Sequence, residues 1–419
     1  MKYELLSKTV GEYKHYDSCR FCFGKNLIPV INLGYVPLAG GFLTSKKGFS
    51  SEKSYPLEIS FCKDCYLVQS TNIIDKETLF KNYFYRSSAI KTLTDHFRET
   101  ADEIMSQTEG LIAEIGCNDG TFIKYIVNKK RRAVGVDPAT NIVTPLIKKG
   151  LPIINDYFSE KVAKDIIKKY GKADAIFSSN TLAHIENMHD IFKGIKMLLS
   201  KDGMLIFEVH YLGNLLHEVQ YDMIYHEHQY YYSLITLQKF LGKYNFEIVD
   251  VKKISIHAGS IRFYVKNNES KPKVSENVKL LFKQEKENKL DKTETYTYFN
   301  KKIYKTKNDL VILLKKLKSE GKTIAGYGAS GRGTIIMNYC DLNEEYLDYV
   351  IDDSTAKQNN YTPGTHLKII SSAILNTKNR PDYVLLFAWS FFEEIKKRNR
   401  KYCDKGGKFI IPLPQVIIT

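Results

Sequence analysis

The sequence predicts an α/β protein with three regions, residues 1–76, 77–265 and 266–419, and two observations support that fold class. First, short apolar runs such as "GLIAEIGC", "RAVGVDP" and "GMLIFEVHY" alternate with amphipathic helical patterns in the second region. Second, the alternation returns from about residue 321, after a charged stretch whose leucines recur at helical spacing. Parallel sheets with crossover helices produce this alternation, and their ligands bind at the carboxyl ends of the strands. Late in the second region, "FEIVDVKKI" and "SIRFYVKN" predict an antiparallel pair of strands at the sheet edge.

The composition narrows the possible classes of protein. The chain has 419 residues, 43% of them hydrophobic, and a net charge of +15. Its apolar runs are shorter than the ~18 residues of a membrane span, and its first residues lack the apolar stretch of a signal peptide. We therefore expect a cytoplasmic protein without a membrane partner, and a monomer is plausible. The lysines are scattered, often beside glutamates, which argues against a nucleic-acid partner and fits a small anionic ligand such as a nucleotide.

Four of the seven cysteines form two close pairs, in "CRFC" and "CKDC". Each pair places two thiolates in one tight turn, as a tetrahedral zinc ion requires. An odd cysteine count without a secretion signal indicates a reducing compartment, where metal is a better explanation than disulfides. Four sulfur ligands leave no open position for a substrate, so we expect a structural zinc module in the first region. Its predicted ligands are Cys19, Cys22, Cys62 and Cys65.

The loop "EIGCNDG" ends the first strand of the second region and begins a helix. Gly116 and Gly120 allow a ligand to lie against the backbone, where the helix N–H groups face it. Asp137 ends the next strand, about twenty residues later, where a carboxylate can hold the hydroxyls of a ribose. Asp156 ends the third strand, at a position suited to an adenine amino group. The E-x-G-x-x-x-G spacing resembles the first motif of class I, Rossmann-like S-adenosylmethionine methyltransferases, which implies S-adenosylmethionine as the cofactor. The further cofactor contacts expected are Glu114, Asn118, Tyr157 and Ser179.

A second glycine loop, "GYGASG", opens the third region. Gly326, Gly328 and Gly331 form a G-x-G-x-x-G pattern between a strand and a helix, with Asp352 and Asp353 about twenty residues later. Taken alone, this pattern predicts a dinucleotide site on a Rossmann-like domain. Any nucleotide phosphate, or a tight turn without a ligand, could use the same glycines, so both interpretations stay open at this point.

Nearly the whole chain resembles the sugar C-methyltransferases that act on nucleotide-linked 4-keto-deoxysugars. The cysteine module with "NLGYVPLAGGF" carries the first part of the resemblance. The stretches "EIGCNDGTF", "SSNTLAHIEN" and "YDMIYHEHQYYYS" carry the second, and "GYGASGRGTIIMN", "DDSTAKQNNYTPGTHLKI" and "FAWSFFEEI" the third. The resemblance implies that the C-terminal α/β domain helps to bind the sugar nucleotide and not NAD. The chain departs from the family pattern with Arg332, where a lysine is usual, and with Lys368, where a proline is expected.

The stretch "YDMIYHEHQYYYS", residues 221–233, concentrates groups that can move or share a proton. Methylation of a carbon beside a ketone needs a base that forms the enolate and a donor that stabilises the enolate oxygen. Histidine suits the base, and tyrosine or a second histidine suits the donor. The resemblance implies catalytic roles for Tyr225, Glu227 and His228, whereas His226 is expected to be structural. A metal site at "HEH" is disfavoured because the H-E-x-x-H spacing is absent.

The remaining expectations concern the substrate and the overall activity. Arg262 could pair with a phosphate, and His96 and His210 receive no role. We expect methylation at C3 of the deoxysugar, in the biosynthesis of a branched sugar for a polysaccharide or a secondary metabolite. The alternatives are methylation of another carbon or of an oxygen, or a zinc-bearing RNA-binding protein. The substrate contacts expected are Asn180, His184, Tyr83, His257, Ser260, Arg262, Arg332 and Lys357.

Overall fold

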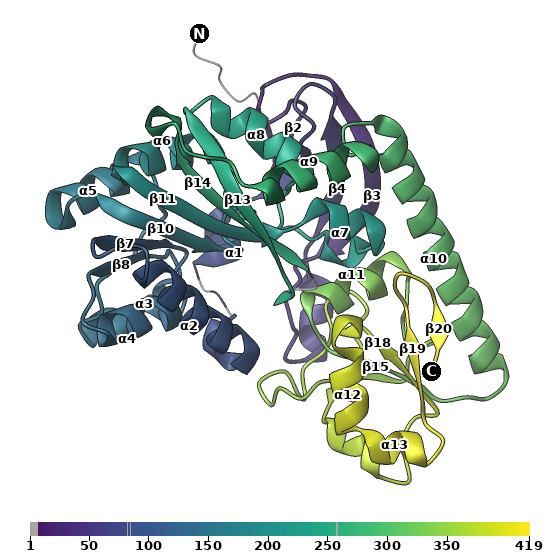
Figure 1. The fold of residues 1–419 in the computed structure, drawn as a ribbon. Coiled ribbons are helices and arrows are strands. Elements are labelled where there is room, and N and C mark those ends of the chain that lie inside the picture. Colours follow the sequence, from purple (N-terminus) through teal and green to yellow (C-terminus); the bar gives the residue numbers. More distant parts are fainter. Residues whose placement is uncertain (1–6, 82, 84, 257–258) are drawn as a thin grey trace.

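The computed structural model describes residues 7–81, 83, 85–256 and 259–419, and these residues form four β-sheets with helices around them (Figure 1). His257, one of the predicted substrate contacts, lies outside the described residues. Within the described part of the chain, no helix has both the length and the apolar character that a membrane span needs.

The largest sheet has seven strands and is built by the second region. All of its neighbouring pairs are parallel except the two that involve β14, so the predicted antiparallel pair at the edge is confirmed. The strand order reverses between β7 and β10, which places a ligand crevice at the carboxyl ends of these two strands. In sheet order the strands are β13 (Phe246–Ile254), β14 (Ser260–Asn267), β11 (Leu199–His210), β10 (Ala173–Ser179), β7 (Leu111–Ile115), β8 (Ala133–Val136) and β9 (Ile153–Ile154).

Helices cover both faces of this sheet, because successive side chains of each strand point to opposite sides. In β7, Leu111 and Ala113 pack with one group of helices, while Ile112 packs with the other. The first group is α5 (Glu160–Tyr170), α6 (Met188–Leu198), α8 (Leu234–Gly242) and α9 (Glu276–Glu287). The second group is α2 (Lys91–Met105), α3 (Thr121–Asn128) and α4 (Thr140–Lys148). The α9 helix lies beyond the predicted boundary at residue 266 but packs with the second region.

The N-terminal region forms two small antiparallel sheets. The larger one is completed by β12, which belongs to the second region and ends the "YDMIYHEHQYYYS" stretch. Its register pairs Tyr230 with Gln69 and Tyr231 with Val68. In sheet order the strands of the larger sheet are β12 (Tyr230–Tyr231), β5 (Val68–Ser70), β4 (Ser54–Cys62) and β3 (Leu27–Pro37). The smaller sheet consists of β1 (Ser7–Val10), β2 (Tyr13–Tyr16) and β6 (Asn72–Ile74), and α1 (Lys76–Phe80) follows it.

The C-terminal region is a second α/β unit with a six-stranded sheet, parallel except for its last strand. The long helix α10 (Thr293–Ser319) leads into it and runs beside β3 (Figure 1). Buried side chains of β3, α10 and this unit form one continuous core, so the first and third regions pack directly together. In sheet order the strands are β17 (Ile369–Ile370), β16 (Tyr349–Ile351), β15 (Ile324–Tyr327), β18 (Tyr383–Leu386), β19 (Lys408–Ile411) and β20 (Ile417–Ile418). Its helices are α11 (Gly331–Tyr339), α12 (Phe392–Arg398) and α13 (Arg400–Asp404).

Candidate active site and zinc centre

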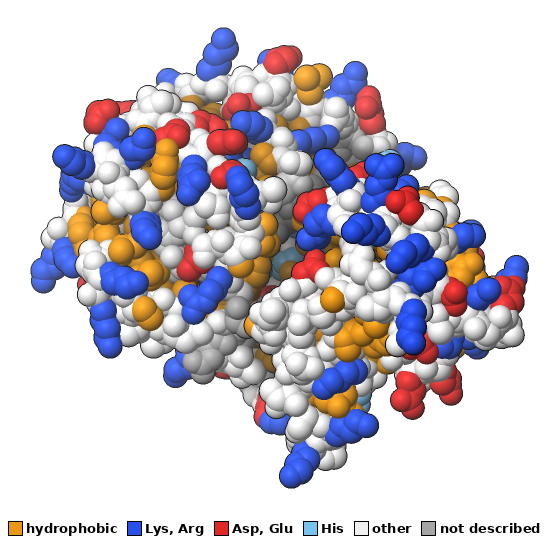
Figure 2. All heavy atoms as spheres, turned by 90° about the horizontal axis from the view of Figure 1, so that it is seen from below, with side chains coloured by type: hydrophobic (Ala, Val, Ile, Leu, Met, Phe, Trp, Pro, Cys, Tyr) orange, Lys and Arg blue, Asp and Glu red, His pale blue; other side chains and the backbone are white. Residues whose placement is uncertain are grey.

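A cavity of about 480 Å³ opens at the carboxyl ends of β7, β8, β10 and β11, where the strand order predicts a ligand site. Seen from below, the surface is hollowed between two lobes, and a histidine is visible inside the hollow (Figure 2). The cavity brings together predicted residues that lie far apart in the sequence, from the first glycine loop and from the stretch 221–233. Those that line it are Tyr83, Glu114, Gly116, Asn118, Asp137, Tyr157, Ser179, Asn180, His184, Tyr225 and His228.

The first glycine loop shapes one wall of this cavity. Gly116 has a φ of +81°, and a Cβ there would lie 2.0 Å from the Thr181 hydroxyl, so only glycine fits. The Asp137 carboxylate accepts hydrogen bonds from the backbone N–H groups of Asn118 and Ala139, both at 2.8 Å. Each carboxylate oxygen keeps acceptor capacity beyond these bonds. Asp137 therefore fixes the loop while it can still accept hydrogen bonds from ribose hydroxyls.

The carboxyl groups of Glu114 and Asp137 both line this wall. Burial raises the pKa of Glu114 well above its usual value, and the nearby Asp137 and Asp119 raise it further. Among the described residues, the buried Oε2 of Glu114 has no hydrogen-bond partner. A site with unsatisfied carboxyl acceptors suits a cation that carries hydroxyl and ammonium donors, because the bound cation would favour the ionised form of these groups. S-adenosylmethionine is such a molecule, so the residues present fit this cofactor.

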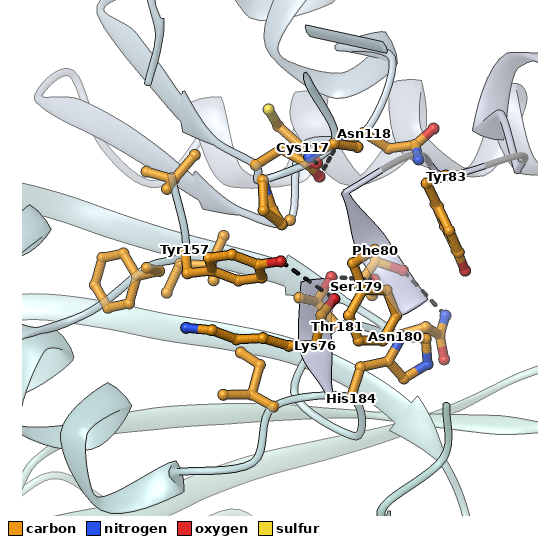
Figure 3. A pocket seen from close by; sticks show the side chains of 18 of the residues that line it. Lys76, Phe80, Tyr83, Cys117, Asn118, Tyr157, Ser179, Asn180, Thr181 and His184 are labelled. Carbon is orange, nitrogen blue, oxygen red and sulfur yellow. Dashed lines mark hydrogen bonds between the residues drawn. The ribbon is translucent and has the colours of Figure 1, made fainter. Parts of the chain in front are cut away.

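The segment that follows the zinc module covers the cavity. Lys76 and Phe80 of α1 line it beside Tyr157, with the Lys76 ammonium 4.1 Å from the centroid of the Tyr157 ring (Figure 3). The Tyr157 hydroxyl donates to the Lys76 carbonyl at 3.2 Å. Two predicted cofactor residues lie outside the lining. Asp156 is exposed and accepts the Tyr157 N–H at 2.7 Å, and Gly120 packs against Leu146 at the start of α3.

The predicted catalytic stretch contributes Met223, Tyr225 and His228 to the cavity lining, and a hydrogen bond indicates the tautomer of His228. The Nδ1 atom of His228 lies 2.8 Å from the Met223 carbonyl, which can only accept a hydrogen bond. Nδ1 therefore carries a proton, so that in the neutral form of the ring the lone pair is on Nε2. The His228 ring centroid lies 4.0 Å from that of Tyr225 and 5.2 Å from that of His184.

Glu227 does not line the cavity, but it is hydrogen-bonded to Tyr83, which does. The Tyr83 hydroxyl donates to its Oε2 at 2.7 Å. Burial raises the pKa of Glu227 to about 7, although the bond from Tyr83 acts in the opposite direction. The pKa of Tyr225 is also raised by burial and by Glu227, whereas the charge of Arg332 lowers it. The neighbouring His226 points elsewhere, since its Nε2 lies 3.2 Å from the Tyr55 carbonyl and burial lowers its pKa to about 4.

The four paired cysteines converge on one point, with all their sulfur atoms within 4.8 Å of one another. The Sγ atoms of Cys19 and Cys65 are 3.4 Å apart, and those of Cys22 and Cys62 are 3.5 Å apart. A tetrahedral zinc ion with Zn–S bonds of about 2.3 Å would hold its sulfurs about 3.8 Å apart, so the cluster fits zinc. The backbone N–H groups of Phe21 and Gly24 also donate to Sγ atoms at 3.4 Å.

Three family models match successive parts of the chain. Residues 19–80 match the family model described as "Putative zinc binding domain", residues 85–251 match "Methyltransferase domain", and residues 255–414 match "C-methyltransferase C-terminal domain". The chain is 30% identical to the C-methyltransferase NovU of Streptomyces niveus over 407 residues, which cover 95% of this chain and 96% of that protein. The chain belongs to the C-methyltransferase family.

Solved structures of methyltransferases also resemble part of this C-methyltransferase. One is magnesium protoporphyrin IX methyltransferase from Synechocystis with bound S-adenosylhomocysteine, at 15% identity and a TM-score of 0.32, covering 41% of this chain and 81% of that one. Another is an S-adenosylmethionine-dependent methyltransferase from Archaeoglobus fulgidus, at 12% identity and a TM-score of 0.34, covering 41% and 94%. With the family established, this C-methyltransferase uses S-adenosylmethionine, and its cluster of four cysteines is a zinc site.

In the C-methyltransferase, Arg262 is not placed to meet a phosphate. Its side chain is 2% exposed, and its guanidinium bonds Glu208 at 2.8 Å and Glu103 at 2.9 Å. Glu208 in turn accepts the Ser179 hydroxyl at 2.8 Å and contacts His96 Nε2 at 2.8 Å. The donors of the guanidinium thus bind the buried carboxylate of Glu208 and the half-buried one of Glu103, which argues against the expected phosphate contact of Arg262. Ser260 likewise lies outside the cavity lining, and its hydroxyl donates to the Ile256 carbonyl at 3.3 Å.

The two predicted substrate contacts of the C-terminal domain lie at the carboxyl ends of its strands. Arg332 bonds the buried carboxylate of Asp222 at 2.7 Å, and the Trp389 indole N–H donates to the same oxygen at 2.9 Å. Asp222 directly precedes Met223, so this contact ties the C-terminal domain to the loop that holds His228. The Lys357 ammonium donates to the Ala329 carbonyl at 2.7 Å, inside the second glycine loop. Neither residue lines the cavity described above.

Several residues of the C-methyltransferase site were missed from the sequence. Lys14 of the N-terminal region and Phe80 at the end of α1 line the cavity, and no local motif marks them. His210 also lines it, at the end of β11, with Nε2 2.8 Å from the Gln220 side-chain oxygen. The end of a parallel strand is the position that indicated Asp137, so the same rule could have indicated His210.

Proposed function

We propose that this enzyme methylates C3 of a nucleotide-linked 4-keto-deoxysugar through an enolate, in the biosynthesis of a branched sugar. The observation that carries the proposal is the hydrogen bond from His228 Nδ1 to the Met223 carbonyl, because it fixes the tautomer and the orientation of an imidazole that lines the cavity. A carbon acid needs such a base before it can accept a methyl group. A ketone at C4 makes the hydrogen at C3 acidic enough for an imidazole to remove.

Each of the residues at the cavity is given a separate role in this reaction. S-adenosylmethionine, held by Asp137 and the Gly116 loop, supplies an electrophilic methyl group when bound. His228 removes the C3 proton, while Tyr225, whose ring lies 4.0 Å from that of His228, donates a hydrogen bond to the enolate oxygen at C4. Glu227, whose pKa of about 7 allows it to exchange a proton near neutrality, holds the Tyr83 hydroxyl beside the substrate.

The nucleotide part of the substrate is proposed to reach the C-terminal domain. The second glycine loop ends at Ser330, which caps α11, so backbone N–H groups at the start of this helix are oriented toward an anion. Arg332 and Lys357 add positive charge there. The link from Arg332 to Asp222 gives this domain a direct connection to the catalytic loop. We propose the cytoplasm as the compartment, because the zinc thiolates need a reducing environment to avoid disulfide formation.

The proposal is tested with His228→Ala and a panel of nucleoside-diphosphate 4-keto-deoxysugars, with products identified by mass spectrometry. The variant should bind S-adenosylhomocysteine normally and lose methyl transfer by roughly two to four orders of magnitude. With S-adenosylhomocysteine in place of the methyl donor, the wild type should exchange solvent deuterium into C3, and His228→Ala should not.

Two outcomes would contradict parts of this proposal. Exchange that persists in His228→Ala but disappears in Glu227→Gln or Tyr225→Phe would transfer the role of base to that residue. A methyl group found on oxygen, or on a carbon that does not exchange, would exclude the enolate at C3. His226→Ala serves as the control, because its ring contacts the Tyr55 carbonyl and not the cavity.

A further inference from the structure

One buried arginine joins the zinc centre to the catalytic stretch. Arg20 is the second residue of "CRFC" and is 1% exposed. Its NH1 donates to the side-chain oxygen of Gln229 at 2.8 Å, and its NH2 donates to the Gln229 carbonyl at 2.8 Å. NH2 also donates to the Ser70 carbonyl at 3.2 Å, and the guanidinium lies 4.1 Å from the centroid of the Tyr230 ring. One side chain of the zinc module thus holds both the side-chain oxygen and the backbone carbonyl of Gln229.

Gln229 connects two of the histidines that line the cavity, His184 and His228. It directly follows His228, and its side-chain N–H donates to the His184 carbonyl at 2.9 Å. Its backbone N–H donates to the Ala183 carbonyl at 2.8 Å. The His184 and His228 rings, with centroids 5.2 Å apart, therefore sit on segments that Gln229 ties together. A shift of Gln229 would change the spacing of these two rings.

Arg20 is a buried cation whose positive charge needs to be compensated. A buried guanidinium usually needs an anionic partner, because neutral acceptors compensate only part of its lost hydration. Within the described part of the chain, all the hydrogen-bond acceptors of Arg20 are neutral. A zinc ion bound by four thiolates carries a net negative charge, and Cys19, one of these ligands, directly precedes Arg20. A loaded zinc centre at the adjacent Cys19 would supply such an anion.

We propose that Arg20 is a positioning residue through which the zinc centre controls the geometry of the catalytic stretch. The zinc–thiolate cluster stabilises the buried guanidinium, and the guanidinium fixes Gln229 between His184 and His228. Zinc thereby affects turnover without contact with the substrate or with S-adenosylmethionine. The catalytic importance of His228 rests on the proposed function, but the coupling itself does not depend on it.

Three variants test the coupling. Arg20→Lys keeps the charge but loses the two-point hold on Gln229, since an ammonium is not a planar fork. Arg20→Met removes both the positive charge and the hydrogen bonds to Gln229. Lys243→Met is the matched control, because the Lys243 ammonium donates to the Phe21 carbonyl of the same knuckle at 2.8 Å. The measurements are zinc release to a chromogenic chelator, calorimetric binding of S-adenosylhomocysteine, methyl transfer, and the ring ¹⁵N NMR signals of His228.

Arg20→Lys should release zinc at the wild-type rate, yet shift the His228 signals and lower kcat by roughly tenfold or more, the effect of losing a charge-assisted hydrogen bond. Arg20→Met should show the same loss of kcat together with faster zinc release. Both should bind S-adenosylhomocysteine within about twofold of wild type, because Arg20 contacts none of the residues around Gly116 and Asp137. Lys243→Met should keep wild-type His228 signals and kcat.

Unchanged His228 signals and kcat in Arg20→Lys would overturn the proposal. Equal losses in Lys243→Met, accompanied by weaker S-adenosylhomocysteine binding, would also overturn it, since they would indicate a general loss of packing. If the arginine variants do not fold, Gln229→Glu replaces them: it offers Arg20 a carboxylate but removes the donor to the His184 carbonyl. It should keep zinc and lose kcat, and wild-type kcat there would overturn the coupling.

The two proposals fail in different ways. The proposed function fails if His228→Ala keeps wild-type turnover. The coupling fails if the His228 signals are insensitive to Arg20, and this readout requires no substrate.

Discussion

Replacing Glu227 by glutamine should stabilise the protein at neutral and alkaline pH while it slows methyl transfer. The carboxyl group is 8% exposed, and burial raises its pKa from 4.5 to about 7. Between these two pKa values the native protein keeps a proton that the unfolded chain has released. The contribution of this group to stability is therefore greatest below pH 4.5 and decreases as the pH rises, until it is lost above about pH 7.

The size of the effect follows from the pKa difference. A shift from 4.5 to about 7 corresponds to about 3 kcal/mol of destabilisation when Glu227 is ionised. Glutamine carries no charge and keeps an oxygen that can accept the Tyr83 hydroxyl. Glu227→Gln should thus gain up to about 3 kcal/mol over wild type above pH 7, and the gain should disappear toward pH 4.5.

Urea unfolding of both proteins at several pH values between about 5 and 8 measures this difference. Glu285→Gln is an informative control, because burial also raises the pKa of Glu285 to about 7. Its two oxygens accept the N–H groups of Leu234 and Ile235 at 2.7 and 2.9 Å, and the glutamine NH₂ cannot accept. The control should lose one of these hydrogen bonds, so its gain over wild type above pH 7 should be smaller than that of Glu227→Gln. A Glu227→Gln protein that is less stable than wild type at pH 8, or whose advantage does not vary with pH, would refute the reasoning.

Three further perturbations have equally defined outcomes. Cys62→Ser should lose zinc by metal analysis and expose the N-terminal region to proteases; a wild-type zinc content would contradict the ligand assignment. Asp137→Ala should weaken S-adenosylmethionine binding by ~1.5–3 kcal/mol in calorimetry, and binding of NAD by the wild type in place of that cofactor would reverse the assignment of the two glycine loops. Arg262→Met should lower the free energy of unfolding by about 3–5 kcal/mol, because it leaves the carboxylate of Glu208 buried with less compensation; an unchanged melting temperature would exclude that.

Short-range patterns predicted much of this molecule. The cysteine pairs, the Gly116 loop and the position of Asp137 at a strand end all depend on spacing within about twenty residues, which a sequence displays directly. The fold class and the family followed from these motifs and their order, and both are confirmed. The roles of Tyr225, Glu227 and His228 stay predictions, although two of the three line the cavity.

The contacts that a sequence does not display are those between distant segments. Arg20 and Gln229 are 209 positions apart, and Arg262 meets Glu208 across neighbouring strands, 54 positions away. A sequence identifies Arg262 as a cation but cannot tell whether its partner will be a ligand phosphate or a buried carboxylate. The partner depends on the strand register, because Arg262 pairs directly opposite Glu208 and the two side chains therefore lie on the same face of the sheet.

The strand β12 has a consequence for how the chain folds as it is made. It supplies the fourth strand of the N-terminal sheet from a position more than 150 residues beyond its partner β5. When the first seventy-odd residues leave the ribosome, β5 is still an open sheet edge, available for pairing with another chain. Zinc can assemble its knuckles at that stage, but the sheet must wait for the methyltransferase region. A chain cut after residue 76 should therefore bind zinc and self-associate, whereas one that continues through β12 should stay dispersed.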